Sequence, residues 1–475
     1  MSEQQSYPSL KNHFTRFCYP FLFEKKEYGK LRNRLSSLSG ITEVLNDPHN
    51  EDWKARSEYF LPPLRRIWYP HFLLKGHLVD VDDPSDIICH FKYDVGAIDL
   101  IKGSTLSVSS KFFDPIPIVI RTASITISYL GIGFLTFEIA INDTNPTFDK
   151  LLNLNSSLRM MNNKNTSIIT DGGASFSMAE LLDSVLDKFR DALGWSDVSS
   201  TTEGVELFGH LNDIYYDRVL CFSYACIDAD IYNRLETDFV KYWQYWPPNV
   251  DSILNDDPDK EFGFDRWNYH FSMWKHAIYG FSKEGGVVFS SACDSFNEHV
   301  LPNYFGTYYY DIFLIAVMQR MILLRINREL SNSEKLSGID KKAYNRNLAL
   351  RRDLLEFVNK CVFTQCSNYE LGQLIWHRWK IVFEMENLLD EVKNQCEELS
   401  NYMEVRRQML VGNFMNILSF FVIPVSLILS LFGANFIEFE KLSVKSILVW
   451  FSLIITFVAA GITWIWLYRK EKTNQ

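Results

Sequence analysis

Small and polar side chains follow a single line along the uncharged segment 409–432. Stepping back from its last serine by three or four residues at a time traces a seam with a 3.5-residue period, which places its members on one face of a helix. The seam consists of Met409, Gly412, Asn416, Ser419, Ile423, Ser426 and Ser430. The other faces of the segment are mainly Leu, Ile, Val, Phe and Met, with Asn413 as the one polar residue off the seam.

Two kinds of chemistry suit this seam. Small residues allow helices to approach closely, so the seam is suited to a helix–helix contact. Alternatively, copies of the helix surround an axis and the seam faces water and ions. The amide of Asn416 favours this second interpretation, because an amide inside a membrane needs a partner or water. A single helical hairpin cannot enclose a pore, and the second interpretation therefore requires an oligomer of cyclic symmetry.

The seam lies in the first of two long uncharged segments, 409–432 and 446–468. A helix needs about 20 apolar residues to cross the hydrocarbon core of a bilayer, so both segments are predicted to be transmembrane helices. Positive residues precede the first and follow the second, which places both termini in the cytoplasm. The prediction is a multi-pass protein of the cell (inner) membrane, with 433–445 as an extracytoplasmic loop and 469–475 as a cytosolic tail.

The residues before the first span, 306–408, are predicted to form a helical stalk region. No proline occurs between Ala343 and Arg407, and apolar residues recur there at helical spacing. A helix that ran from Leu371 through the first span would be roughly 90 Å long. The apolar run at 312–324 is short and carries a glutamine and an arginine, so it is predicted to be a buried helix of the soluble part.

Residues 1–305 are predicted to form a cytosolic α/β domain. The segment 104–141 is rich in β-branched and aromatic residues and is expected to contain two or three strands. Another strand is expected in the sequence GVVFSSA, which starts at Gly285. Ser177 and Glu180 have the spacing of a capping box and predict the start of a helix.

The composition of the 475-residue chain excludes several classes of function. A net charge of -10 argues against nucleic acid as a direct partner. The eight cysteines include no CxxC pair, so they are interpreted as reduced, mostly buried thiols rather than as a disulfide framework or a zinc site. No HExxH motif, P-loop or nucleophile–base pair stands out, and the chain is not expected to be an enzyme.

Three features of the C-terminal region together resemble the CorA family of Mg²⁺ and divalent-cation channels. The sequence NFMNILS, residues 413–419, is similar to the N-x-x-M-K-x-L-T motif of that family. Pro424 stands where the family has an internal proline, and FGANF, residues 432–436, is similar to its Y-G-M-N-F signature. The resemblance covers roughly residues 350–475.

The resemblance implies a homopentamer in which the first span lines an ion pore that the cytosolic domain gates. Gly433, Ala434 and Asn435 would form the selectivity filter, where a ring of amides accepts hydrogen bonds from the water shell of Mg²⁺ or another divalent cation. The seam becomes the pore wall, with Met409 and Ile423 as candidate apolar constrictions. The expected partners are the lipid bilayer, further copies of the chain and the transported cations.

The chain also departs from the family pattern. Ala434 replaces the usual methionine and Asn416 the usual lysine, and the domain 1–305 is larger than is typical. Divergent relatives of this family accompany type III CRISPR systems. There they act as membrane effectors of antiviral defence and are switched by a nucleotide second messenger. The alternative function is therefore a nucleotide-switched effector. A membrane-anchored scaffold that conducts nothing is a third interpretation, in which the seam serves only for packing.

Overall fold

The structure, a computed structural model, describes residues 8–44, 51–69, 88–193, 218–232, 270–331 and 341–433. The chain divides into two compact units. The first comprises Met1–Glu329 and Arg352–Val392, and the second Leu330–Arg351 and Lys393–Gln475. Among the described residues the first unit contains a β-sheet with helices on both faces, whereas the second unit is helical.

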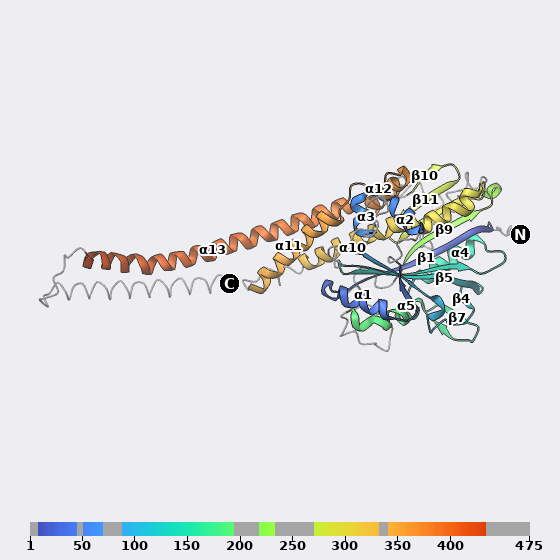
Figure 1. Cartoon of the computed structure of the whole chain (residues 1–475), viewed down its shortest axis with the longest axis horizontal. Coiled ribbons are helices and arrows are strands. Elements are labelled where there is room, and N and C mark those ends of the chain that lie inside the picture. Colours follow the sequence, from blue (N-terminus) through green and yellow to red (C-terminus); the bar gives the residue numbers. More distant parts are fainter. Residues whose placement is uncertain are drawn as a thin grey trace. The chain divides into compact units, whose positions relative to one another are not determined.

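A mixed sheet of twelve strands forms the centre of the first unit, counted over the described residues (Figure 1). Ten strands follow the order β10-β11-β12-β9-β1-β6-β5-β4-β7-β8, while β3 pairs with both β5 and β2 beside this path. The described pairs are antiparallel except β12 with β9. The strands are β1 (Leu10–Leu22), β2 (Ile41–Glu43), β3 (Ile88–Tyr93), β4 (Leu106–Ser110), β5 (Ile116–Ser128), β6 (Ile132–Ile141), β7 (Thr166–Thr170), β8 (Ser175–Phe176), β9 (Leu220–Ile227), β10 (His270–Trp274), β11 (Ala277–Ser282) and β12 (Gly285–Ser291).

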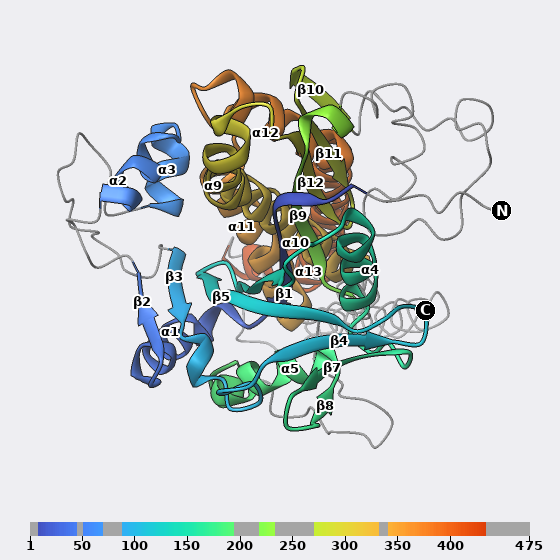
Figure 2. The same ribbon diagram turned by 90° about the vertical axis from the view of Figure 1, so that its right-hand side faces the viewer.

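The helices α1, α4 and α5 lie along one face of the sheet (Figure 2). Successive strand residues point to opposite faces, and the ring of Phe21 on this face lies 6.5 Å from that of Phe189 in η5. The ring of Phe148 in α4 lies 5.1 Å from that of Phe289 in β12. The elements on this side are η1 (Lys25–Glu27), α1 (Tyr28–Ser37), α4 (Phe148–Arg159), α5 (Met178–Leu186) and η5 (Asp187–Ala192), and η4 (Val95–Ala97) follows β3.

The opposite face of the sheet is covered by α10, α12 and the helical residues before α10. Phe222 of β9 stacks on Phe305 with ring centroids 3.9 Å apart, and Phe281 of β11 meets Trp379 of α12 at 5.0 Å. Two short helices, α2 and α3, pack beside β3 through Trp53. These elements are α2 (Glu51–Glu58), α3 (Pro62–Trp68), η6 (Phe296–Val300), α9 (Leu301–Tyr304), η7 (Phe305–Tyr309), α10 (Tyr310–Ser331) and α12 (Glu370–Val382).

Several local predictions from the sequence are confirmed. The segment 104–141 contains the three strands β4, β5 and β6, and β12 begins at Gly285. Ser177 caps α5, with its side chain accepting a hydrogen bond from the Glu180 amide while the Glu180 carboxylate accepts from the Ser177 amide. The run 312–324 lies within α10 and is mostly buried.

The predicted stalk is not one continuous helix. It consists of α11 (Lys341–Cys361), α12 and α13 (Met385–Gly433), with non-helical residues at 362–369 and a turn before α13. Glu384 in that turn has a φ of 52°, the one positive φ outside glycine among the described residues. The break at 362–369 has a tertiary cause, because Cys366 and Ser367 bond to the chain near Tyr59. Periodicity within one segment cannot reveal such contacts.

The prediction of two C-terminal transmembrane helices needs correction. Within the described ranges, no helix is long and apolar enough to cross a membrane. This finding contradicts the predicted fold class and the predicted location in the cell (inner) membrane. The prediction of a membrane span at 409–432 follows from the lack of charge in this run. In the structure the run is the end of α13, a 49-residue helix that begins in the charged segment 385–407. The second predicted span, 446–468, lies outside the described residues.

Gly285 provides a test of the β9–β12 pairing. Its φ is +150°, and a Cβ at this position would overlap the carbonyl oxygen of Cys221 on β9. We expect Gly285→Ala to lower the free energy of unfolding by about 3 kcal/mol or more, because backbone strain and a clash add up. Gly173→Ala is the matched control: its φ is also positive, at +82°, but no atom lies within 4 Å of the added Cβ. Urea unfolding of both variants checks this, and equal losses would contradict it.

Candidate functional site

The predicted pore residues lie along α13. All seven members of the seam are exposed in the structure, and Met409 and Ile423 have 63% and 58% of their surface accessible. The hydroxyl of Ser426 donates to the carbonyl of Ile423 at 2.9 Å, and that of Ser430 to Ser426 at 2.8 Å. These two hydroxyls thus bond to the backbone of their own helix. A pore would require several copies of the chain, and the assignment of the seam to a pore wall stays a prediction.

The predicted filter lies at the limit of the described residues. Gly433 is the last residue of α13, and Ala434 and Asn435 lie outside the described part of the chain. No group of three or more His, Cys, Asp or Glu side chains within that part has the arrangement of a metal site. Seven of the eight cysteines are buried, as expected, and Cys293 is exposed. The filter and its divalent cation therefore stay predictions.

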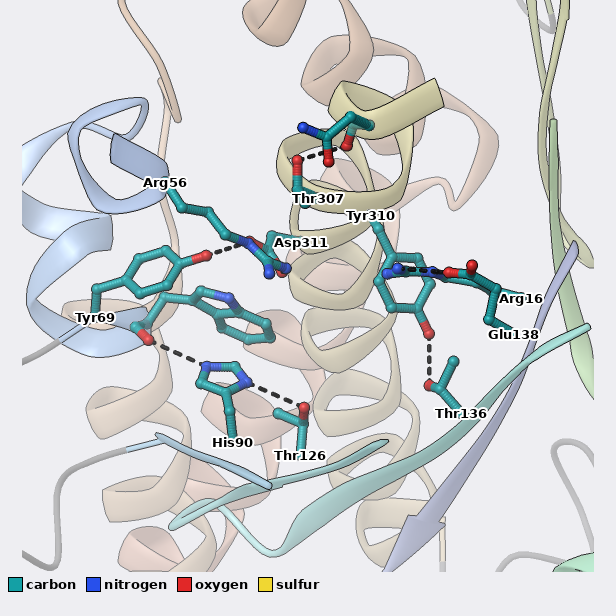
Figure 3. A network of polar contacts seen from close by, with 12 residues as sticks. Arg16, Arg56, Tyr69, His90, Thr126, Thr136, Glu138, Thr307, Tyr310 and Asp311 are labelled. Carbon is teal, nitrogen blue, oxygen red and sulfur yellow. Dashed lines mark hydrogen bonds and ion pairs between the residues drawn. The ribbon is translucent and has the colours of Figure 1, made fainter. Parts of the chain in front are cut away.

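A different site is present in the first unit, where a cavity of about 780 Å³ lies between the sheet and the start of α10. Its walls come from β1, β2, β3, β5, α2 and α10. Four cationic side chains border it, together with two carboxylates. The cations are Arg16, Arg56, Lys92 and Arg121, and the carboxylates are Asp94 and Asp311. Figure 3 shows three of these side chains near the start of α10: Arg56 and Asp311 point toward each other, and Arg16 lies beside Tyr310.

The sheet side of the cavity is polar because of strand register. Lys92 on β3 stands opposite Ser124 on β5, and Thr122 stands opposite Glu138 on β6. Paired residues share a face of the sheet, and the next polar residue on the same face is always two positions away. The residues that share this face are Arg16, His90, Lys92, Thr122, Ser124, Thr126, Thr136 and Glu138. The intervening residues, such as Phe91 and Ile125, are buried on the opposite face.

Two of the four cations are already paired with carboxylates. The Arg16 guanidinium donates to Glu138 at 2.9 Å and lies 4.6 Å above the ring of Tyr310. The Arg56 guanidinium donates two hydrogen bonds to Asp311, at 2.7 and 2.6 Å. Burial alone would lower the pKa of Arg56, but the charges and hydrogen bonds of Asp311 and Tyr69 together outweigh burial and raise that pKa. Tyr69 also donates its hydroxyl to Asp311, which is only 2% exposed.

The other two cations, Lys92 and Arg121, have no acidic partner within the described ranges. Both side chains are exposed, and no hydrogen bond or ion pair joins either to the described residues. Arg121 is the extra residue of a β-bulge, since Ile120 and Thr122 flank a shift in the register between β5 and β6. Bulges commonly redirect one side chain beside a functional site. Neither residue was predicted from the sequence. The alternation of Thr122, Ser124 and Thr126 marks a polar face of β5, but Lys92 lies on β3 and Arg121 is the bulge residue outside that alternation.

The aromatic rings around the cavity are covered by cations of the chain itself. The Arg56 guanidinium lies 4.7 Å above the ring of Trp53, and the Lys188 amine lies 5.6 Å from that of Tyr93. Arg16 covers Tyr310 in the same way. A ligand in the cavity would therefore meet charges and hydroxyl groups before open aromatic faces.

His90 borders the cavity as a neutral side chain. Its Nδ1 lies 3.1 Å from the Thr126 hydroxyl, and its Nε2 lies 3.2 Å from the carbonyl oxygen of Trp68. Because Nε2 must donate to that carbonyl, the neutral ring accepts from Thr126 through Nδ1. Burial lowers the pKa of His90 to about 4, even though Asp311 acts in the opposite direction. A base with this pKa is poorly matched to proton abstraction at neutral pH, so His90 is suited to a structural role rather than to catalysis.

The geometry thus defines a mixed α/β protein with a polar, cation-lined cavity between its sheet and α10. Neither models of known protein families nor curated proteins match the chain. The resemblance to the CorA family accordingly stays a prediction made from residues 350–475.

The two buried histidines predict the pH dependence of stability. Burial lowers the pKa of His13, whose Nε2 accepts a hydrogen bond from the Ile141 amide, to about 4, as it does for His90. An unfolded histidine titrates near 6.5, so between these values the unfolded chain binds more protons and stability increases with pH. We expect the free energy of unfolding to fall as the pH drops from about 7 to 4.5, by on the order of 3 kcal/mol per histidine.

Urea unfolding at a series of pH values measures this effect. His90→Gln should remove about half of the slope between pH 4.5 and 6.5, whatever it does to absolute stability. His299→Gln replaces an exposed histidine and should leave the slope unchanged. A slope in His90→Gln equal to that of the unmodified chain would refute the assignment.

Proposed function

We propose that the first unit binds a small phosphorylated ligand in the cavity and that this ligand regulates the chain. The observation that carries the proposal is the presence of two unpaired cations, Lys92 and Arg121, in a cavity whose other two cations are neutralised. A phosphate accepts charge-assisted hydrogen bonds from both lysine and arginine. It would supply the direct acidic partner that Lys92 and Arg121 do not have among the described residues.

The groups around these two cations support a phosphate ligand further. Thr122 and Ser124 lie on the same face of the sheet as Lys92 and border the cavity. Their hydroxyls are suitable donors to phosphate oxygens. The volume of about 780 Å³ lies within the range of roughly 300–1,000 Å³ that is usual for small-molecule sites.

A nucleotide is the ligand class that we propose. It combines phosphate with sugar and base groups that both donate and accept hydrogen bonds, which suits a wall made of cations, hydroxyls and the carboxylate of Asp94. This choice agrees with the alternative prediction of a nucleotide second messenger. The proposal concerns binding and regulation, not catalysis. Divalent-cation conduction by a homopentamer stays a prediction from the sequence, and no geometry among the described residues favours it.

The regulatory part of the proposal follows from the position of α10. Tyr310 and Asp311 are its first two residues and both border the cavity. A ligand there would contact the helix that also carries the buried run 312–324. Rigid, buried helices respond to a contact by shifting as a unit rather than by bending locally.

Calorimetric titration of the full chain with inorganic pyrophosphate, ADP and a 3′–5′-linked diadenylate tests the proposal. We expect at least one of the three to bind, and Lys92→Gln combined with Arg121→Gln to weaken that binding by about thirtyfold, since two charge-assisted contacts are lost. Lys102→Gln combined with Lys164→Gln is the control, because it removes the same charge from exposed positions that do not border the cavity.

Two results would contradict the proposal. One is the absence of binding by all three probes at millimolar concentration. The other is equal affinity for the cavity variant and the control variant, which would place the bound probe elsewhere on the chain.

A further inference from the structure

We infer that Arg56 responds to a ligand in the cavity. The 51–69 segment, comprising α2, α3 and the residues around them, transmits this response to the start of α12. The inference rests on the proposed function, because it assigns a regulatory route to the same ligand site. It concerns the described residues of the first unit only.

Beside the cavity, two separate residues of the 51–69 segment hold Asp311. Arg56 donates to both carboxylate oxygens, and Tyr69 donates its hydroxyl to one of them (Figure 3). Arg56 also lies over the ring of Trp53, so the guanidinium is fixed to its own helix as well as to α10. The carboxylate at the start of α10 is therefore attached to this segment at both of its ends.

Between Arg56 and Tyr69, at the connection from α2 to α3, the segment is attached to the residues that precede α12. The ring of Tyr59 stacks on Tyr369 with centroids 4.8 Å apart and planes 8° from parallel, and on Tyr308 at 4.6 Å. The Ser367 hydroxyl donates to the Tyr59 carbonyl at 2.6 Å. The Leu61 amide donates to the Cys366 carbonyl at 2.9 Å, and a β-bridge joins the chain beside them.

Close packing makes this second attachment stiff. Gly372, in the first turn of α12, lies so near Tyr59 that a Cβ there would meet the tyrosine hydroxyl and ring at 2.5 to 2.9 Å. A displacement of Tyr59 would therefore press on the backbone of α12. Only Phe383 and Glu384 separate α12 from α13, and the strained φ of Glu384 lies in this connection.

Electrostatics gives the direction of the response. A phosphate between Lys92 and Arg121 would attract the guanidinium of Arg56 and repel the carboxylate of Asp311, and both groups border the same cavity. A buried ion pair resists partial separation, since an unpaired buried charge is strongly unfavourable. Arg56 and Asp311 must therefore either stay in place or move together with α2 and α10, the helices that carry them. Because Arg56 lies in the last turn of α2 and Tyr59 follows directly after that helix, a shift of Arg56 would move Tyr59 and, through its contacts with 366–369, the start of α12.

Hydrogen exchange of the full chain, with and without the probe that binds best among pyrophosphate, ADP and the diadenylate, tests the inference. We expect binding to change exchange rates by at least about twofold both in peptides from 51–69 and in peptides from 362–382. Tyr369→Ala removes an exposed ring from the Tyr59 stack, at a position that does not border the cavity. It should keep the affinity for the probe and lose the change in 362–382.

Tyr402→Ala is the matched control, because Tyr402 is also about half exposed, at 50%, but lies on α13. It should preserve both changes. Arg56→Lys keeps the positive charge yet cannot donate two hydrogen bonds side by side, and at a probe concentration that saturates this variant it should show a smaller change in 362–382 than the unmodified chain.

The failures of the two proposals are distinguishable. If the probe binds but exchange in 362–382 is the same with and without it, the route through 51–69 is wrong and the ligand site stands. The route is equally wrong if Tyr369→Ala responds like the unmodified chain. If no probe binds, the ligand site fails and the route fails with it.

Discussion

The register of β5 between β3 and β6 is the constraint on which the rest of the first unit depends. One strand has to satisfy two neighbours at once, so a shift by a single residue would turn every side chain of β5 to the wrong face. In the observed register, Ile125 and Ile127 are fully buried on the face toward α1, while Thr122, Ser124 and Thr126 face the cavity. Hydrophobic burial on one side thus determines where the polar groups collect on the other.

The polar side of the sheet is compatible with folding because most of its charges are matched within the chain. Arg16 pairs with Glu138 and Arg56 with Asp311, and each guanidinium also lies over an aromatic ring. Pairing of this kind offsets much of the desolvation cost of the buried groups, although it adds little net stability. What it does provide is a defined position for α2 and α10 relative to the sheet. Lys92 and Arg121 stay exposed to solvent, and their charge is available to a ligand.

Local features of the sequence predicted local structure well. The three strands in 104–141, the strand at Gly285, the capping box of Ser177 and the buried helix at 312–324 all depend on propensity, periodicity or capping chemistry within a few residues. Helical periodicity also predicted the helices of 306–408 but not the break at 362–369, because there the chain bonds to distant residues around Tyr59. The prediction of a membrane span, made from the apolar and uncharged length of 409–432, is wrong in the described residues, where this run is the end of the 49-residue helix α13.

The candidate site shows the same division. The sequence by itself determined which strands of the first unit are amphipathic and which residues of β5 alternate between apolar and polar, since both follow from the two-residue period of a strand. It did not show that Lys92, Arg121, Arg56 and Asp311 border one cavity, because these residues come from β3, β5, α2 and α10 and their proximity depends on strand order and helix packing. Only the tertiary structure decided which cations are neutralised, since charge pairing acts through space and not along the chain.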